Sequence, residues 1–265
     1  MAVSFEEGKE VLIFNVDTGK EVHRVKTPFE EPLKGSSARA VVEFSPDGSV
    51  LAATSGGRAW PNFVGGNSTI SLWNVDDWSL RASFTGDRFT MYDVKFSPDG
   101  KLLAGATNRG KTIKLWEVPA AAPKVKGDDD AIAELIKRLD SDDFGQRETA
   151  QRKLTEIGHA AKDALEKAAE SDSAETAFRA EAVLKKLSHG DIQPKHILPR
   201  STFDVHALNF SPDGKWLASG RQFDKPGNVM LYEMGEAPRR VVTPHQHGAW
   251  TLEFTPDGKQ LITGR

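Results

Sequence analysis

A five-residue motif that recurs four times is the feature that most constrains how this chain can fold. The motif is Phe-Ser-Pro-Asp-Gly, with Thr once in place of Ser, and it begins at Phe44, Phe96, Phe210 and Phe254. An apolar and then a polar residue precede each Phe, and this period of two predicts a β-strand with one buried face. Pro-Asp-Gly predicts a turn, because Pro fixes one dihedral angle, Asp bonds its own backbone and Gly supplies a positive φ. A strand rich in Leu, Ala and Thr follows, so each copy predicts a β-hairpin.

Two further strands complete each repeat. A third strand that ends in an aromatic and then a polar residue is predicted at residues 70–74, 113–117 and 229–233, and also at residues 11–15. A fourth strand is predicted at residues 21–25, 80–84 and 239–243. Four antiparallel strands in about 44 residues is the period of one β-propeller blade.

These residues resemble WD40 repeats, in the degenerate form that bacterial members carry. The resemblance rests on the Ser-Pro-Asp-Gly turn and on a third strand that ends in Leu-Trp plus a polar residue, where the family has Trp-Asp. No copy keeps the Trp-Asp pair, and Gly86-Asp87 is the nearest trace of the family's Gly-His pair. The resemblance implies a mainly β chain folded as a WD40-type β-propeller of about four blades, whole or part of a larger propeller. Apolar columns of Phe, Leu and Trp, rather than the family's buried hydrogen-bond network, are expected to hold the blades together.

An interval of 114 residues between the second and third motif copies leaves room for an inserted segment. Apolar residues recur in it at helical spacing and predict four short helices, with caps at Asp128–Asp130, Asp142/Asp143 and Asp172/Ser173 and a stop at Gly158. The segment resembles the HEAT-like all-α segments found within some bacterial WD40 proteins. We therefore predict propeller blades at residues 1–123 and 191–265 and a helical-repeat insertion at residues 124–190. WD40 topology implies that an insertion between a third strand and a fourth strand at 196–203 projects from the face opposite the usual top surface.

The overall composition excludes several classes of function. The formal net charge is −3, from 35 Lys and Arg against 38 Asp and Glu. A general nucleic-acid binder would show a basic excess, so no nucleic-acid partner is expected. The chain has no Cys, which excludes thiolate zinc sites and cysteine nucleophiles. Its apolar runs are too short for a membrane span and its N-terminus lacks the pattern of a secretory signal, so we expect a cytoplasmic location and no membrane contact.

No catalytic, cofactor or metal site is predicted. His245 and His247 have no visible third ligand for a metal ion. The repeated carboxylates are expected to form turns on separate blades rather than a catalytic set: Asp47, Asp99, Asp213 and Asp257. No phosphate loop or hydrolase motif is present, so no cofactor is expected.

The two ends of the chain leave three architectures open. Residues 10–25 supply a third and a fourth strand, and the last motif copy supplies a first and a second, which together would close a four-blade ring. Ala2–Phe5 also matches the end of a second strand, which such closure does not need. The alternatives are an excerpt of a longer propeller, a closed four-blade ring, and half of a ring formed by self-association of two chains.

One loop between a second and a third strand is the leading binding candidate. Residues 56–67 are flanked by glycines and carry Arg58, Trp60 and Phe63, while the corresponding loop 221–228 carries Arg221 and Phe223. Aromatic and Arg side chains commonly anchor protein interfaces. The WD40 resemblance implies that such loops line the face where partners dock. In the alternative, Trp60 and Phe63 fold back onto the blade.

We expect the chain to be a non-catalytic scaffold that presents propeller surfaces to protein partners. The alternative is a hydrolase or lyase with its site at the mouth of the central channel. Ionisable side chains with strongly shifted pKa values that converge in a channel pocket would favour the enzyme. Isolated loop charges would favour the scaffold.

Overall fold

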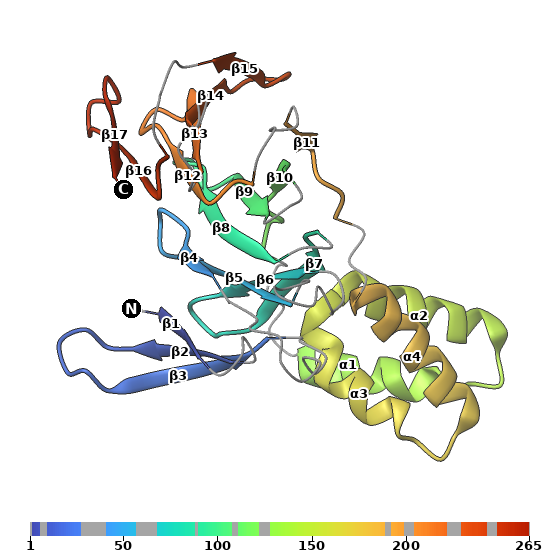
Figure 1. Cartoon of the computed structure of the whole chain (residues 1–265). Coiled ribbons are helices and arrows are strands. Elements are labelled where there is room, and N and C mark those ends of the chain that lie inside the picture. Colours follow the sequence, from blue (N-terminus) through green and yellow to red (C-terminus); the bar gives the residue numbers. More distant parts are fainter. Residues whose placement is uncertain are drawn as a thin grey trace, which may run out of the picture.

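The structure is a computed structural model of the 265-residue chain. It describes residues 2–5, 10–27, 41–56, 68–87, 90–107, 111–121, 128–188, 192–198, 204–221, 229–242 and 248–264. These residues form five antiparallel sheets and a bundle of helices (Figure 1).

Three of the sheets have four strands each, as the repeat predicts. The first sheet consists of β4 (Val42–Phe44), β5 (Val50–Gly56), β6 (Ser68–Asn74) and β7 (Leu80–Thr85). The second sheet consists of β8 (Met91–Phe96), β9 (Leu102–Thr107), β10 (Ile113–Glu117) and β11 (His196–Ile197). The third sheet consists of β12 (Ala207–Phe210), β13 (Trp216–Gly220), β14 (Val229–Glu233) and β15 (Arg239–Val242).

Two smaller sheets lie at the ends of the series. The N-terminal sheet consists of β1 (Ala2–Phe5), β2 (Glu10–Phe14) and β3 (Glu21–Lys26). The C-terminal sheet consists of β16 (Thr251–Phe254) and β17 (Leu261–Gly264). The N-terminal sheet is tied to the first sheet by Trp78, whose ring stacks on His23 with centroids 5.0 Å apart.

All four motif copies form the same hydrogen-bonded turn. In each copy the Ser or Thr hydroxyl donates to the Asp carboxylate at 2.6 Å, and it accepts from the backbone N–H five residues later at 2.9 to 3.1 Å. The motif Gly has a φ of 68° to 72°, a region that favours Gly. The hydroxyl of the same turn is the main cause that lowers the pKa of Asp47 and of Asp213 to about 2. These carboxylates therefore serve the turns, as predicted.

The hydrophobic core lies between neighbouring sheets. The first strands β4, β8, β12 and β16 contact one another in succession, and the sheets fan out from them in an arc (Figure 1). Buried apolar side chains form four clusters among the sheets, and each cluster is shared by two neighbours. This arrangement is consistent with WD40 blades.

The aromatic residue of each third strand packs against the preceding sheet. Trp73, Trp116 and Tyr232 are at most 3% exposed, and each belongs to the cluster shared with the sheet before its own. The indole Nε1 of Trp116 is buried and has no hydrogen-bond partner among the described residues. Apolar packing therefore holds Trp116 in place, as expected from the departure from the family's pattern.

The two ends of the arc do not join into one blade. β1 pairs with β2 in the register Ala2↔Ile13 and so takes the edge of β2 that β17 would need for ring closure. Among the described strands, β17 pairs with β16 alone. The described residues therefore form three four-stranded sheets between two smaller ones, and the strand pairing that a closed four-blade ring would need is not found among them.

The insertion folds as two helical hairpins. It contains α1 (Asp128–Arg138), α2 (Phe144–Ile157), a 3₁₀ turn η2 (Gly158–Ala161), α3 (Lys162–Ala169) and α4 (Ala174–Ser188). Asp143 caps α2 by accepting from Gly145 N–H at 2.7 Å, and Ser173 accepts from Thr176 N–H at 3.2 Å at the start of α4. Gly158 ends α2 with a φ of 69°. These predicted caps are confirmed, whereas Asp128–Asp130 form the first turn of α1 rather than preceding it.

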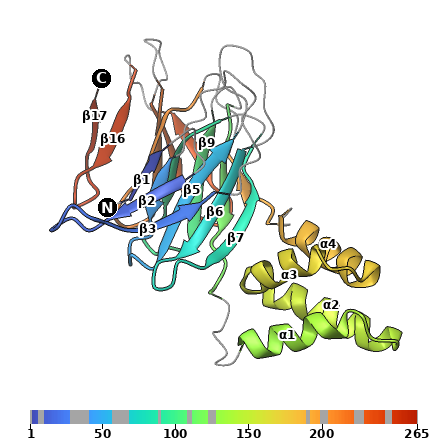
Figure 2. The same ribbon diagram turned by 90° about the horizontal axis from the view of Figure 1, so that it is seen from below.

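The insertion leaves the second sheet at the end where the motif turns lie. β10 runs from its partner Ala106 toward Leu102, so Glu117 lies beside the turn of its own sheet. The helices share a separate buried cluster, and η2 and α4 contact β7 (Figure 2). Glu117 forms an ion pair with Lys195, which joins the two crossings of the chain between the sheet and the insertion.

Deletion of the insertion tests whether its core is independent of the sheets. Replacing residues 126–190 with a short Gly-Ser linker is expected to leave the sheets folded, because the helices bury their apolar side chains in a cluster of their own. Far-UV circular dichroism should show loss of the helical signal and retention of the β signal. Loss of both signals would contradict this account.

Removal of one turn hydroxyl tests the contribution of the motif. Ser97→Ala should lower the free energy of unfolding by about 1–2 kcal/mol, because Leu102 N–H and Asp99 lose a partner at a buried position. Thr255→Val removes the same hydroxyl in the more exposed C-terminal turn and should cost less than half as much. Urea unfolding followed by tryptophan fluorescence measures both, and equal losses would show that burial does not set the cost.

Candidate functional site

The candidate surface lies at the end of the sheets opposite the motif turns. In each sheet the second strand runs away from the turn, so β5 ends at Gly56 and β13 ends at Gly220 on this side. The loops that lead to the third strands leave from these points. We call this side the loop end and the opposite side the turn end.

Four of the five predicted binding residues lie outside the described residues: Arg58, Trp60, Phe63 and Phe223. The fifth, Arg221, directly follows β13 and is only 5% exposed. Burial lowers the pKa of its guanidinium, and the charge of Asp204 acts in the opposite direction. Its carbonyl accepts from Ala249 N–H at 2.7 Å, which ties it to the C-terminal sheet. Arg221 is therefore largely buried, and its role in partner binding stays a prediction.

Three rings from three successive sheets lie side by side at the loop end. Tyr92 and His206 pack with ring centroids 4.5 Å apart, and His206 meets Trp250 edge-on at 5.8 Å. We call these three residues the aromatic arc. Trp250 is 48% exposed, whereas Tyr92 and His206 are half-buried, so Trp250 presents most of the exposed surface of the arc.

The repeat itself brings these rings together. Each arc residue is the fourth residue before a motif Phe and so stands where a first strand begins. The backbone N–H groups of His206 and Trp250 donate to Gly220 and Gly264, each at 2.9 Å, which fixes both positions against the second strand of their own sheet. A Cβ added at Gly220 would lie 2.8 Å from the carbonyl oxygen of Ala249, so Gly at this position permits the close approach of the C-terminal sheet.

Polar side chains link the first strands below the arc. Lys95 of β8 forms an ion pair with Glu43 of β4 at 2.8 Å. Asp93 of β8 accepts from the backbone N–H of Leu208 on β12 at 2.7 Å. The register of β8 shifts between Met91 and Asp93, and such a bulge re-aims the side chains around it. β8 thus makes one polar link to each of its neighbours.

The Asp93 carboxyl is the most perturbed acid among these links. Burial raises its pKa from 3.8 to about 6, and the charge of Glu43 adds to the rise. Lys95 and the Leu208 N–H act in the opposite direction but do not compensate. Since the carboxylate is occupied by the Leu208 N–H, its observed role is to join two sheets.

The described ranges show neither a metal cluster nor a membrane helix. No three His, Asp or Glu side chains come together there as a metal site would require, and no helix in these ranges has the length and apolar character to cross a membrane. His245 and His247 lie outside them. A groove of about 260 Å³ lies on the insertion between α1 and α2, away from the aromatic arc, and Arg138, Asp143 and Lys153 are among its lining residues.

The aromatic arc was not predicted from the sequence. Its signal is a column in the repeat: aligning the four copies on the motif Phe places Tyr92, His206 and Trp250 in one position, with Ala40 as the fourth member. A search of the columns outside the strand pattern would have found it.

A comparison with protein-family models identifies two repeats in the chain. Residues 78–117 and 192–232 match the model described as "WD domain, G-beta repeat". The first match begins just before β7, the outermost strand of the first sheet, and ends in β10, the third strand of the second sheet. The second match begins just before β11 of the second sheet and ends in β14 of the third sheet. The chain therefore carries WD40 repeats at these two sites. Each repeat, as the family model defines it, contains strands of two neighbouring sheets.

A comparison with curated proteins shows that part of this chain is similar to a protein of known name. Apoptotic protease-activating factor 1 of Danio rerio is 27% identical over 130 residues, which cover 46% of this chain. The aligned region is 9% of that protein's length, so the similarity concerns a small part of it.

Substitution of Asp93 tests the buried link between β8 and β12. A carboxyl whose pKa is raised on folding favours the folded state below its unfolded pKa, and this contribution is lost as the pH rises through the folded pKa. Asp93→Asn keeps an oxygen acceptor for Leu208 N–H without the buried charge. The variant should therefore be more stable than the wild type at pH 7.5, by on the order of 2 kcal/mol.

The difference between the two proteins should vanish between pH 6 and pH 4, the interval that the raised pKa of Asp93 defines. Urea denaturation at a series of pH values measures it. The exposed turn carboxylates titrate in both proteins and cancel in the comparison. A difference that does not change with pH would show that Asp93 does not carry the charge assigned to it.

Proposed function

We propose that this chain is a non-catalytic scaffold that binds a protein partner at the loop end of its sheets. The aromatic arc carries the proposal, because it places Tyr92, His206 and Trp250 in one continuous array beside the loops. Exposed aromatic residues on a rigid base are frequent anchors of protein interfaces. WD40 repeats generally mediate protein–protein contacts, and the two matched repeats support the same reading.

A difference between the turn end and the loop end in the engagement of their side chains supports this proposal. At the turn end, the motif side chains are engaged in hydrogen bonds of their own turns. The segments 57–67 and 222–228, which follow β5 and β13 in the sequence, carry Arg58, Trp60, Phe63 and Phe223, and we retain these residues as candidate contacts. A partner that spans several blades would touch residues from separate repeats, which is a common route to specificity on a repeat scaffold.

The contacts of the ionisable side chains on the first strands favour a scaffold over an enzyme. Asp93 has the raised pKa that a catalytic acid would need, but its carboxylate accepts from Leu208 N–H. Lys95 and Glu43 neutralise each other in an ion pair. These three groups are explained by the contacts between neighbouring sheets.

We assign the insertion, residues 124–190, to the HEAT-like class as a second scaffold element. α1 packs on α2 and α3 on α4 within the hairpins, while α1 contacts α3 and α2 contacts α4 across them. This pairing is typical of stacked helical repeats.

Substitution at the loop end tests the proposed interface. Trp60→Ala with Phe63→Ala, and separately Trp250→Ala, should reduce the recovery of cross-linked protein partners from a lysate of the source cells by at least about tenfold. The midpoint of thermal unfolding of the Trp250 variant should change by less than about 2 °C, because the Trp250 side chain is half exposed. We expect an equally small change for the Trp60 and Phe63 variant. Quantitative mass spectrometry of the cross-linked products measures the recovery.

A matched pair at the turn end serves as the control. Lys215→Ala with Lys259→Ala changes two exposed side chains on the opposite side of the sheets and should leave recovery unchanged. A large fall in the unfolding midpoint of the Trp60 and Phe63 variant would show that these rings belong to the core. Equal recovery from all variants would exclude the loop end as the interface.

A further inference from the structure

The outer face of the helical insertion carries two exposed aromatic side chains. Phe144 at the start of α2 is 63% exposed, and Phe178 on α4 is 68% exposed. α2 and α4 pack side by side. Both residues lie in the first half of their helices, at the end of the bundle away from η2, which contacts β7. The contact of η2 with β7 therefore lies at the other end of the bundle.

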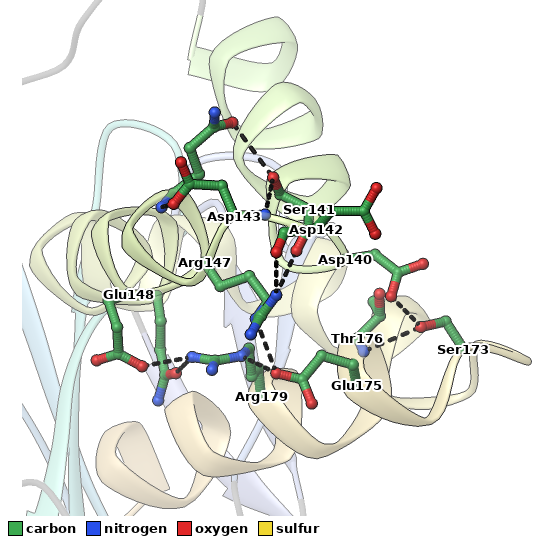
Figure 3. A network of polar contacts seen from close by, with 12 residues as sticks. Asp140, Ser141, Asp142, Asp143, Arg147, Glu148, Ser173, Glu175, Thr176 and Arg179 are labelled. Atoms are coloured by element: carbon green, nitrogen blue, oxygen red, sulfur yellow. Dashed lines mark hydrogen bonds and ion pairs between the residues drawn. The ribbon is translucent and has the colours of Figure 1, made fainter.

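A buried arginine joins the two helices beside the Phe144 ring. Arg179 is 7% exposed, and its guanidinium donates to Glu175 at 2.6 Å, to Glu148 at 2.8 Å and to the amide oxygen of Gln151 at 2.6 Å (Figure 3). Glu148 and Gln151 lie on α2, whereas Glu175 lies on α4, so the network fixes the spacing of the helices. Its carboxylate partners raise the pKa of Arg179, which therefore stays charged.

A second arginine supports Phe144 from the side of the turn. Arg147 donates to the carbonyl of Asp142 at 3.2 Å and pairs with Glu175 at 3.2 Å. The guanidinium carbons of Arg147 and Arg179 lie 5.6 and 5.9 Å from the centre of the Phe144 ring. The ring thus rests on two fixed cations. An anchor that is already held in place loses little conformational entropy when it binds.

The charges around this face are mainly negative. Two guanidiniums in the network face five carboxylates at the same end of the bundle: Asp140, Asp142, Asp143, Glu148 and Glu175 (Figure 3). Both guanidiniums are paired, while Glu148 and Glu175 keep 53% and 43% of their side-chain surface exposed. A second copy of the same face would bring like charges together, so self-association through it is disfavoured.

We propose that the face formed by Phe144 and Phe178 on α2 and α4 docks a basic amphipathic helix of a partner protein. The apolar side of such a helix would cover the two rings, and its Lys or Arg residues would meet the exposed carboxylates. This surface is separate from the loop end, so the chain would hold two partners at once.

Fluorescence anisotropy with a synthetic probe tests the proposal. The probe is a fluorescein-labelled helical peptide of Leu and Lys with one apolar and one basic side, and the full chain is titrated into it. Phe144→Ser with Phe178→Ser should weaken binding by at least about tenfold. Val16→Ser with Val22→Ser, which changes two exposed apolar residues on the N-terminal sheet, should leave binding unchanged.

Two further arms separate the alternatives. A peptide of Leu and Glu with the same pattern should not bind. The Trp60 and Phe63 variant should bind the basic probe like the wild type, whether or not the loop end proves to be a partner interface. The helical signal in circular dichroism must be retained in the Phe variants, and the single variant Phe178→Ser replaces the pair if it is not. Equal binding by both double variants, or binding of the acidic peptide, would overturn the proposal.

Discussion

Burial of apolar side chains between neighbouring sheets is the interaction on which the rest of the structure depends. No sheet encloses a core of its own, since each cluster of buried residues draws on two sheets. Trp116 and Tyr232, at the ends of third strands, are the largest fully buried side chains, and burying such a side chain contributes roughly 2–3 kcal/mol. Trp116 makes no polar contact through its indole Nε1 among the described residues, so it is held by apolar packing. The turns, the polar links and the aromatic arc all take their positions from it.

Features fixed by neighbours in sequence could be predicted, and features fixed by distant contacts could not. The motif turns, the strand order and the caps at Asp143 and Ser173 follow from local chemistry, and the structure confirms them. The position of Arg221 is fixed by a hydrogen bond from Ala249 of the next sheet, and no sequence pattern near Arg221 indicates that contact. The register shift of β8 between Met91 and Asp93 likewise has no signal in the local sequence pattern. The aromatic arc had a sequence signal, but it lay in a column that carries no secondary-structure information.

One residue type serves two opposite electrostatic roles in this fold. The motif Asp residues lie in solvent, accept several hydrogen bonds and have lowered pKa values. Asp93 accepts from a backbone N–H as well, yet burial raises its pKa because the loss of hydration outweighs what the few partners return. The exposed turns thus repeat with the same hydrogen bonds in four of the five sheets. The buried link occurs between β8 and β12, where it distinguishes one junction from the others.

The offset between repeat and blade has a consequence for how such a chain can grow. Each matched segment takes in the outer strand of one sheet and the first three strands of the next, so it crosses a junction instead of enclosing a sheet. Duplication of such a segment in a gene would therefore add a new contact between two sheets together with the side chains that pack there. It would not add a sheet whose two faces lack a packing partner. Recombination at these boundaries preserves the lateral packing from which stability arises, which explains how an array can lengthen while every intermediate stays folded.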